Sequence, residues 1–159
     1  MSKPMNKKIL IIYATNSGGT QESSILIENV FKKDGFEVAV KKITEANPED
    51  IGVFDLIIFG SPSWDYKGKE GQVHEDYLPF FEKMKGKTYP DKKFAVFGLG
   101  DSSYTYFAGS SIFLDKFVES LKGQKIGTTL KIDGFYFNEL QNSEKVEDWA
   151  QSLVDILNK

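Results

Sequence analysis

Short apolar runs alternate with amphipathic segments along the chain, and this alternation limits the folds that are open to it. Three runs are almost continuously apolar, as strands covered on both faces are: residues 9–13, 54–60 and 94–98. Residues 36–43 predict a strand with one less buried face. Residues 125–126 and 129–132 predict a last, irregular strand. Hydrophobic spacing predicts helices between the strands, at residues 21–33, 74–84 and 110–121, and a final helix capped by Ser143.

This order of elements is typical of a doubly wound α/β fold, because helical connections between successive strands produce a parallel sheet. We therefore predict an α/β fold with a doubly wound five-stranded parallel sheet and helices on both faces, as a single domain over residues 1–159. Each helix should turn an apolar stripe toward the sheet. The predicted stripes include Ile25, Leu26, Val30, Leu78, Phe113, Leu114 and Phe117.

The segment Thr15-Asn16-Ser17-Gly18-Gly19-Thr20 lies between the first strand and the first helix. Hydroxyls and backbone N–H groups at the start of a helix bind anions. The segment lacks the lysine of a Walker A loop and the Gly-x-Gly-x-x-Gly pattern, so it predicts a loop that holds a phosphate without transferring it. An ordinary capped turn has the same composition, and these six residues alone leave both interpretations open.

Two later loops combine glycines with aromatic residues. One contains Gly60-Ser61-Pro62-Ser63-Trp64-Asp65-Tyr66, and the other contains Gly98-Leu99-Gly100-Asp101-Ser102-Ser103-Tyr104-Thr105-Tyr106-Phe107. Trp64 and Tyr104 are candidates for stacking on a planar ligand, since a Trp is costly to expose; the alternative for Trp64 is packing back on the domain. Gly98 and Gly100 would let the backbone approach a ligand closely. Ligands of such folds bind at the carboxyl ends of the strands, so loops 14–20, 60–71 and 98–109 should converge on a planar heterocycle with a phosphate tail.

These motifs resemble those of flavodoxins, which bind FMN, and the resemblance covers essentially the whole chain. Residues 15–20 resemble the family's phosphate loop, with Ser17 where Thr is usual. Residues 62–64 resemble the loop whose Trp flanks the inner side of the isoalloxazine. Residues 98–107 are similar to the other flavin loop, in which the Tyr at position 104 stacks on the outer face. The resemblance implies the strand order 2-1-3-4-5 with FMN at the switch point, and the short-chain type, because the last strand lacks a long insertion.

The resemblance also implies which residues hold FMN. They are Thr15, Asn16, Ser17, Gly18, Gly19, Thr20, Pro62, Ser63, Trp64, Asp65, Tyr66, Gly98, Leu99, Gly100, Asp101, Tyr104, Tyr106 and Phe107. The backbones of Leu99 and Gly100 are expected to donate to the pyrimidine edge.

The implied function is a non-enzymatic, low-potential one-electron carrier that cycles FMN between semiquinone and hydroquinone and serves a reductase donor and an oxidoreductase acceptor. Aromatic rings keep water from the flavin, and carboxylates such as Asp65 and Asp101 disfavour an anionic reduced flavin. Both effects lower the reduction potential of the semiquinone–hydroquinone couple. An alternative role for Asp101 is to order its own loop by accepting backbone N–H groups, and the two roles stay open.

Asp65 departs from the family pattern, in which Gly directly follows the Trp in many short-chain members. That Gly helps a peptide flip, so that its carbonyl accepts the N5–H of the semiquinone. Asp adopts left-handed backbone conformations at a cost of roughly 1 kcal/mol relative to Gly. We therefore expect a less stabilised semiquinone than in a relative with Gly.

Charge and cysteine content limit the binding partners and the cellular compartment that we expect for this protein. The formal charge is −3 and there is no basic patch, so we exclude nucleic acid and membranes as partners. Acidic residues expected at the flavin edge favour basic redox proteins: Asp65, Glu70, Glu75 and Asp76. The chain has no cysteine, which excludes disulfides, thiolate metal sites and a Cys nucleophile. The first apolar run is too short for a signal-peptide core, and we expect a cytoplasmic monomer without a metal. His74 is expected at the surface, at a helix start.

Two other classes of protein share this topology. An FMN-dependent reductase acting on NAD(P)H or a small substrate needs a proton donor over the ring, and the sequence offers no dedicated acid there. A phosphoacceptor receiver domain needs acidic residues after the first strand and an Asp after the third. The chain has Tyr13-Ala14 and Gly60-Ser61 at those places, which argues against a receiver domain.

Overall fold

The structure is a computed structural model that describes residues 7–66, 69–101 and 108–159, with the side chains of residues 64–66 left aside. The strands of the main sheet are β1 (Lys8–Tyr13), β2 (Glu37–Lys42), β3 (Leu56–Pro62), β6 (Lys93–Gly100), β7 (Gln124–Lys125) and β8 (Leu130–Asp133). A separate pair is formed by β4 (Trp64–Tyr66) and β5 (Lys69–Gln72). The α-helices are α1 (Gly19–Lys33), α2 (Pro48–Val53), α3 (Tyr77–Met84), α4 (Ser110–Ser120) and α5 (Glu139–Leu157), and two short 3-10 helices are η1 (Ile43–Glu45) and η2 (Phe135–Asn138).

The main sheet runs in the order β2-β1-β3-β6, and β7 and β8 both pair with β6 at its far edge. Every pairing is parallel. The predicted doubly wound sheet and its order 2-1-3-4-5 are confirmed, with the fifth position shared by two short strands. The sheet is parallel because each strand is followed by a connection that crosses one of its faces.

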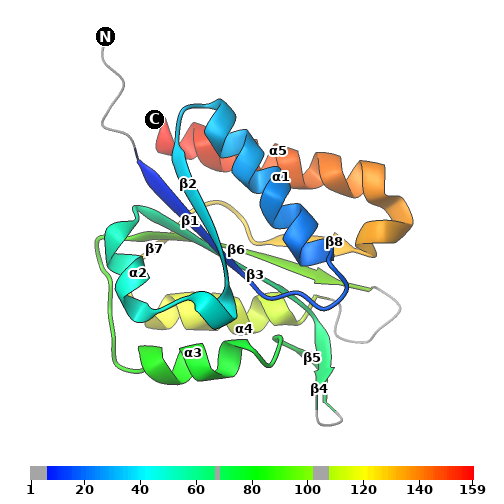
Figure 1. The fold of residues 1–159 in the computed structure, drawn as a ribbon, viewed down its shortest axis with the longest axis horizontal. Helices are drawn as coiled ribbons and strands as arrows, with labels where there is room; N and C mark the ends of the chain where they lie inside the picture. Colours follow the sequence, from blue (N-terminus) through cyan, green and yellow to red (C-terminus); the bar gives the residue numbers. More distant parts are fainter. Residues whose placement is uncertain (1–6, 67–68, 102–107) are drawn as a thin grey trace.

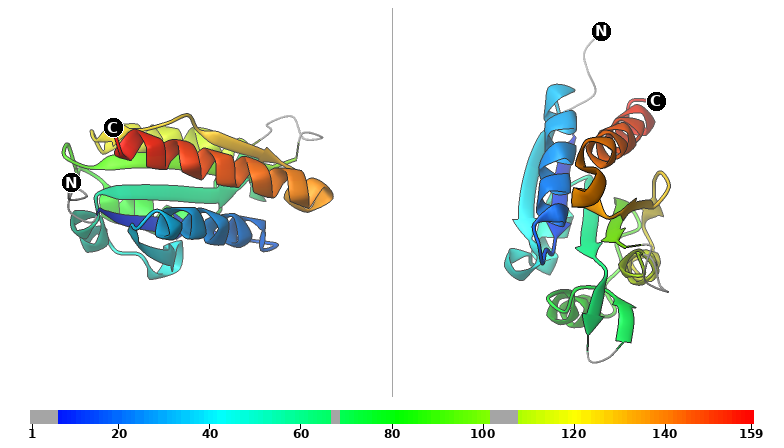
Figure 2. Two further views of the ribbon diagram at one scale, coloured as in Figure 1. Left: turned by 90° about the horizontal axis from the view of Figure 1, so that it is seen from above. Right: turned by 90° about the vertical axis from the view of Figure 1, so that its right-hand side faces the viewer.

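Helices cover the sheet on both sides, in three layers (Figures 1 and 2). One core lies beneath α1 and α5 and contains Ile9, Ile58 and Phe97; the other lies beneath α3 and α4 and contains Leu10, Phe59 and Phe94. Adjacent strand residues point to opposite faces, so a strand covered on both sides is apolar throughout. Within the described residues, no helix has the length and apolar character needed to cross a membrane.

Three residues of the predicted helix stripes are exposed: Ile25, Leu78 and Phe113. In α1 the buried positions are instead Gly19, Thr20, Ser23, Ser24, Ile27 and Phe31. In α4 they are Ser110, Ser111, Leu114 and Val118. Small polar residues occupy the first turns of both buried faces, where the helix approaches the sheet most closely. A stripe assigned from hydrophobicity alone is therefore rotated away from the true one.

Two other elements differ from the sequence prediction. The stretch predicted as a loop at residues 61–71 contains the antiparallel hairpin β4–β5, in which Trp64 pairs with Gln72, and this hairpin extends beyond the main sheet (Figure 1). Helix α5 begins at Glu139, so Ser143 lies inside the helix and does not cap it. Along α5, Val146, Trp149 and Leu153 are all buried.

Tyr77 ties α3 to the carboxyl ends of two central strands. Its ring is fully buried, and its hydroxyl proton is shared between the carbonyl oxygens of Gly60 at 2.9 Å and Ile12 at 3.1 Å. Burial raises the pKa of the Tyr77 hydroxyl well above its ordinary value of 10.0. The hydroxyl therefore stays protonated and keeps donating.

Replacing Tyr77 with Phe is expected to lower the free energy of unfolding by about 1–2 kcal/mol, because the buried carbonyls lose a donor. The raised pKa means that the folded state holds the Tyr77 proton more tightly than the unfolded state. Its contribution to stability is complete below pH 10 and is lost as the pH rises toward the folded-state value. Urea unfolding at pH 8 and pH 11 should show a smaller alkaline loss for Tyr77→Phe than for the wild type. Equal losses would contradict this account.

Candidate functional site

The carboxyl ends of four strands surround one cavity. The register aligns Tyr13 of β1 with Gly60 of β3, Pro62 of β3 with Leu99 of β6, and Gly100 of β6 with Asp133 of β8. The segments that follow these strands therefore leave the sheet at one edge. They enclose about 530 Å³, within the usual range for small-molecule sites. The lining residues are Thr15, Asn16, Ser17, Gly19, Thr20, Pro62, Ser63, Glu70, Gly71, Leu99, Gly100, Asp101, Gly134, Phe135, Tyr136 and Phe137.

The loop after β1 is shaped by two glycines and a threonine. Gly18 precedes α1 with a left-handed backbone (φ 97°), and its N–H donates to Thr15 Oγ1 at 3.0 Å. No side chain caps the helix. A Cβ on Gly19 would lie 2.9 Å from a Leu99 methyl group, so a larger residue here would require the Leu99 side chain to move. Because α1 is not capped from its own loop, its first N–H groups are available to a ligand in the cavity.

Thr20 is the most informative residue of this loop. It is only 1% exposed, and among the residues that the structure describes its Oγ1 has no hydrogen-bond partner. Leaving a buried hydroxyl unpaired costs about 1–3 kcal/mol. Because Thr20 lines the cavity, a polar group bound there would satisfy this oxygen.

A network of serines joins the loop after β3 to the start of α4. The Ser63 N–H donates to the Leu99 carbonyl at 2.7 Å, and Ser63 Oγ accepts from the Ser110 N–H at 3.1 Å. Ser110 Oγ in turn donates to the Ser61 carbonyl at 3.0 Å. These bonds fix the second and third predicted loops relative to each other, and Ser63 itself lines the cavity.

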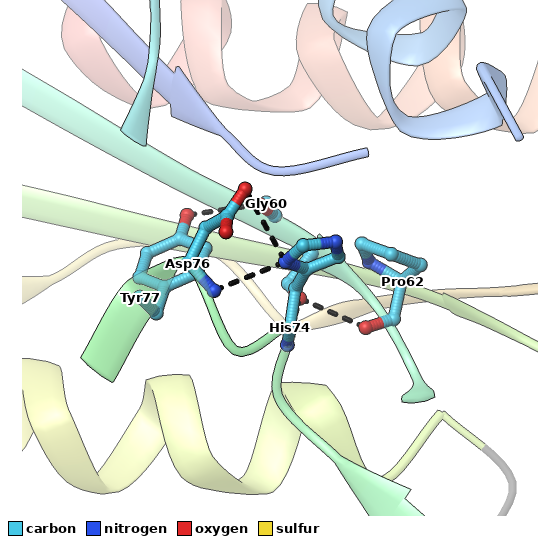
Figure 3. A network of polar contacts seen from close by, with 6 residues as sticks. Gly60, Pro62, His74, Asp76 and Tyr77 are labelled. Carbon is cyan, nitrogen blue, oxygen red and sulfur yellow. Dashed lines mark hydrogen bonds and ion pairs between the residues drawn. The ribbon is translucent and has the colours of Figure 1, made fainter. Parts of the chain in front are cut away.

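His74 is buried, which corrects the expectation that it lies at the surface. It is 7% exposed, its backbone N–H donates to Ser61 Oγ at 2.9 Å, and its Nδ1 accepts from the Asp76 N–H at 3.1 Å (Figure 3). The same Nδ1 lies 3.6 Å from Asp76 Oδ2. His74 therefore anchors the end of the hairpin to β3 and to the start of α3.

The two glycines of the third loop are explained by packing within the protein. Gly98 does not line the cavity, and a Cβ there would lie 3.0 Å from both Ser110 Oγ and Ser111 Cβ. Gly100 does line it, but a Cβ there would lie 2.6 Å from the Ala108 backbone nitrogen. In this structure the absence of a side chain at Gly98 therefore makes room for the start of α4.

Most of the other predicted site residues come together. Those that line the cavity are Thr15, Asn16, Ser17, Gly19, Thr20, Pro62, Ser63, Leu99, Gly100 and Asp101, whereas Gly18 does not. Trp64, Asp65 and Tyr66 are placed by their backbone in β4, and their side chains lie outside the description. Tyr104, Tyr106 and Phe107 fall outside the described residues.

The sequence analysis missed one wall of the cavity. Gly134, Phe135, Tyr136 and Phe137 follow β8 and line the cavity. Gly71 of β5 also lines it, beside Glu70, which was expected at this edge. A signal was present, because a glycine and three aromatic residues directly follow a predicted strand, at the edge where ligands bind. Because the last strand is short and irregular, the segment that follows it was not grouped with the loops after β1, β3 and β6.

Comparisons with known proteins agree with this geometry. The family model described as Flavodoxin matches residues 11–149. A curated flavodoxin of Maridesulfovibrio salexigens is 28% identical over 149 residues, covering 93% of this chain and 97% of that protein. The flavoprotein alpha-component of the NADPH sulfite reductase of Bacillus subtilis is 26% identical over 159 residues, which cover 98% of this chain and 24% of that protein. The crystal structure of oxidised Flavodoxin 2 from Bacillus cereus superposes with a TM-score of 0.84 at 26% identity, over 93% of this chain and 98% of that chain.

Proposed function

The chain belongs to the flavodoxin family, whose cofactor is FMN, and from this we propose that it is a low-potential one-electron carrier. It holds FMN non-covalently in the cavity at the carboxyl edge of the sheet and shuttles electrons between redox proteins. The buried hydroxyl of Thr20, which has no partner among the residues that the structure describes, carries the proposal, because a phosphate at the start of α1 would supply one.

The types of residue around the cavity suit the phosphate and the ring system of FMN. The loop at residues 15–20 offers hydroxyls and uncapped helix N–H groups for a phosphate. Backbone segments at Pro62 and at Leu99 to Asp101 line the neighbouring part, where the ring system would lie against strand ends. Bound FMN supplies one-electron redox chemistry, and the protein holds it, shields it from water and sets the charge around it.

The decisive experiment is an absorption spectrum of the purified protein during anaerobic reductive titration. We expect a flavin spectrum that changes in two separate one-electron stages. A colourless preparation that takes up no added FMN would refute the proposal. Turnover of NAD(P)H by the isolated protein would instead favour a flavin-dependent reductase. The flavoprotein component of the NADPH sulfite reductase contains a segment that is similar to this chain.

Glu70 is proposed to lower the reduction potential. It lines the cavity from β5, and among the described residues its Oε1 is buried without a hydrogen-bond partner. A carboxylate there disfavours the extra negative charge of a reduced flavin. Replacing Glu70 with Gln should raise the more negative of the two one-electron potentials by roughly 60 mV, the equivalent of about 1.4 kcal/mol.

Spectroelectrochemistry would measure this shift, with Glu119→Gln as the control because Glu119 is exposed on α4 and does not line the cavity. A potential that stays within the error of the control would show that Glu70 does not act on the flavin.

The remaining parts of the proposal concern partners and compartment. We propose docking of basic redox proteins at the flavin edge, where Glu70 lines the cavity and Glu75 and Asp76 are exposed at the start of α3. A cytoplasmic monomer is the form we propose for the carrier. Electron transfer to a basic acceptor should then slow as ionic strength rises, because salt screens the attraction.

A further inference from the structure

The segment after β8 is held in one conformation by a buried asparagine. Asn142 of α5 is 3% exposed, and its amide nitrogen donates to the carbonyl oxygens of Asp133, Gly134 and Phe135 at 3.0, 3.2 and 3.3 Å. Gly134 makes the turn with a left-handed backbone (φ 53°). These bonds hold the backbone at the start of η2, which forms part of the cavity wall.

Tyr136 extends from η2 over the loop that begins α1. Its hydroxyl oxygen lies 3.0 Å from the position that a Cβ on Gly18 would take. Its ring packs edge-to-face on Phe135, with centroids 5.2 Å apart and planes at 88°, and both residues line the cavity. The Tyr136 hydroxyl is therefore held beside the uncapped N-terminus of α1.

This hydroxyl and Thr20 Oγ1 are two donors on different walls of the same cavity. Thr20 Oγ1 is buried and has no hydrogen-bond partner within the described part of the chain, whereas Tyr136 is half-exposed at the rim of the cavity. Desolvation first, and then the charges of Glu22 and Glu139, raise the pKa of Tyr136, so the hydroxyl keeps its proton at neutral pH. An anion between these two walls would accept from both.

We propose that Tyr136 is a ligand of the cofactor's phosphate, donating a hydrogen bond from η2 beside the loop at residues 15–20. This assignment rests on the proposed function, since it requires a phosphate monoester in the cavity. Tyr136 acts as a binding residue that selects the phosphorylated flavin over its dephosphorylated form, and it takes no part in electron transfer. Gly18 is glycine partly because any side chain there would meet this hydroxyl.

The test is calorimetric titration of the apoprotein with FMN and, separately, with riboflavin. Replacing Tyr136 with Phe keeps the ring and removes only the donor. FMN affinity should fall about tenfold or more, as expected for a lost hydrogen bond to a charged group, while riboflavin affinity stays unchanged. Tyr89→Phe is the matched control, because the Tyr89 hydroxyl bonds to the Pro48 carbonyl and Tyr89 does not line the cavity.

The outcomes of this titration distinguish a failure of the Tyr136 assignment from a failure of the proposed function. Unchanged FMN affinity in Tyr136→Phe would overturn the assignment, and so would an equal loss for FMN and riboflavin, which would indicate ring packing. Failure of the wild type to bind FMN would overturn the proposed function as well. Inorganic phosphate provides a second readout: it should raise the melting temperature of wild-type apoprotein more than that of Tyr136→Phe, and equal increases would count against the assignment.

Discussion

Replacing Thr20 with Val is expected to make the apoprotein more stable and its hold on FMN much weaker. Val has nearly the shape of Thr but lacks the buried hydroxyl that has no partner among the described residues. The apoprotein should gain about 1 kcal/mol in free energy of unfolding, because an unpaired polar group leaves the interior. FMN affinity should fall about ten- to a hundredfold, since a hydrogen bond to a charged phosphate is lost.

The opposite signs of these two effects make the result specific. Urea unfolding of the apoprotein measures the first, and titration with FMN and riboflavin measures the second, with riboflavin binding unaffected. Thr128→Val is the control, because Thr128 is exposed and does not line the cavity. If Thr20→Val destabilised the apoprotein and left FMN affinity intact, the hydroxyl would have a structural role and no phosphate contact.

Replacing Gly109 with Ala is expected to cost about 2–3 kcal/mol of folding stability through a steric clash. A Cβ on Gly109 would lie 2.4 Å from the carbonyl oxygen of Gly71 and 3.0 Å from its Cα. Both are backbone atoms, so no side chain can rotate away, and the start of α4 must separate from β5. FMN affinity should fall too, because Gly71 lines the cavity and Ser63 is bonded to Ser110.

Gly52→Ala provides the matched comparison. Gly52 lies in α2 with no atom within 4 Å of an added Cβ, and Ala favours a helix over Gly by roughly 1 kcal/mol. This variant should be as stable as the wild type or slightly more so, with unchanged FMN binding. Urea unfolding curves that coincide for the two variants would contradict the close approach of α4 to the hairpin.

The wall formed by η2 shows why part of the site was not predicted. Phe135 and Tyr136 follow a glycine after a predicted strand, but the same residue types also occur in an ordinary aromatic core. They belong to the site because the parallel register places the end of β8 beside the end of β6, and because Asn142 of the following helix fixes the turn. The same holds for His74, whose burial depends on the hairpin folding back to Ser61.

Local pattern was enough for the alternation of strands with helices and for the position of the first three loops, whereas the order of the strands in the sheet was implied by the resemblance to flavodoxins. Continuous apolar runs are buried wherever they lie in such a sheet, and parallel strands end at a common edge, so the loops after β1, β3 and β6 had to meet. Only the tertiary structure decided three other features: the rotation of α1, the Thr20 oxygen that lacks a partner within the described ranges, and the close approach of Gly109 to Gly71. Each depends on contacts between segments that are distant in the chain, and steric fit and hydrogen-bond satisfaction at such contacts are properties of the packed molecule that no local pattern encodes.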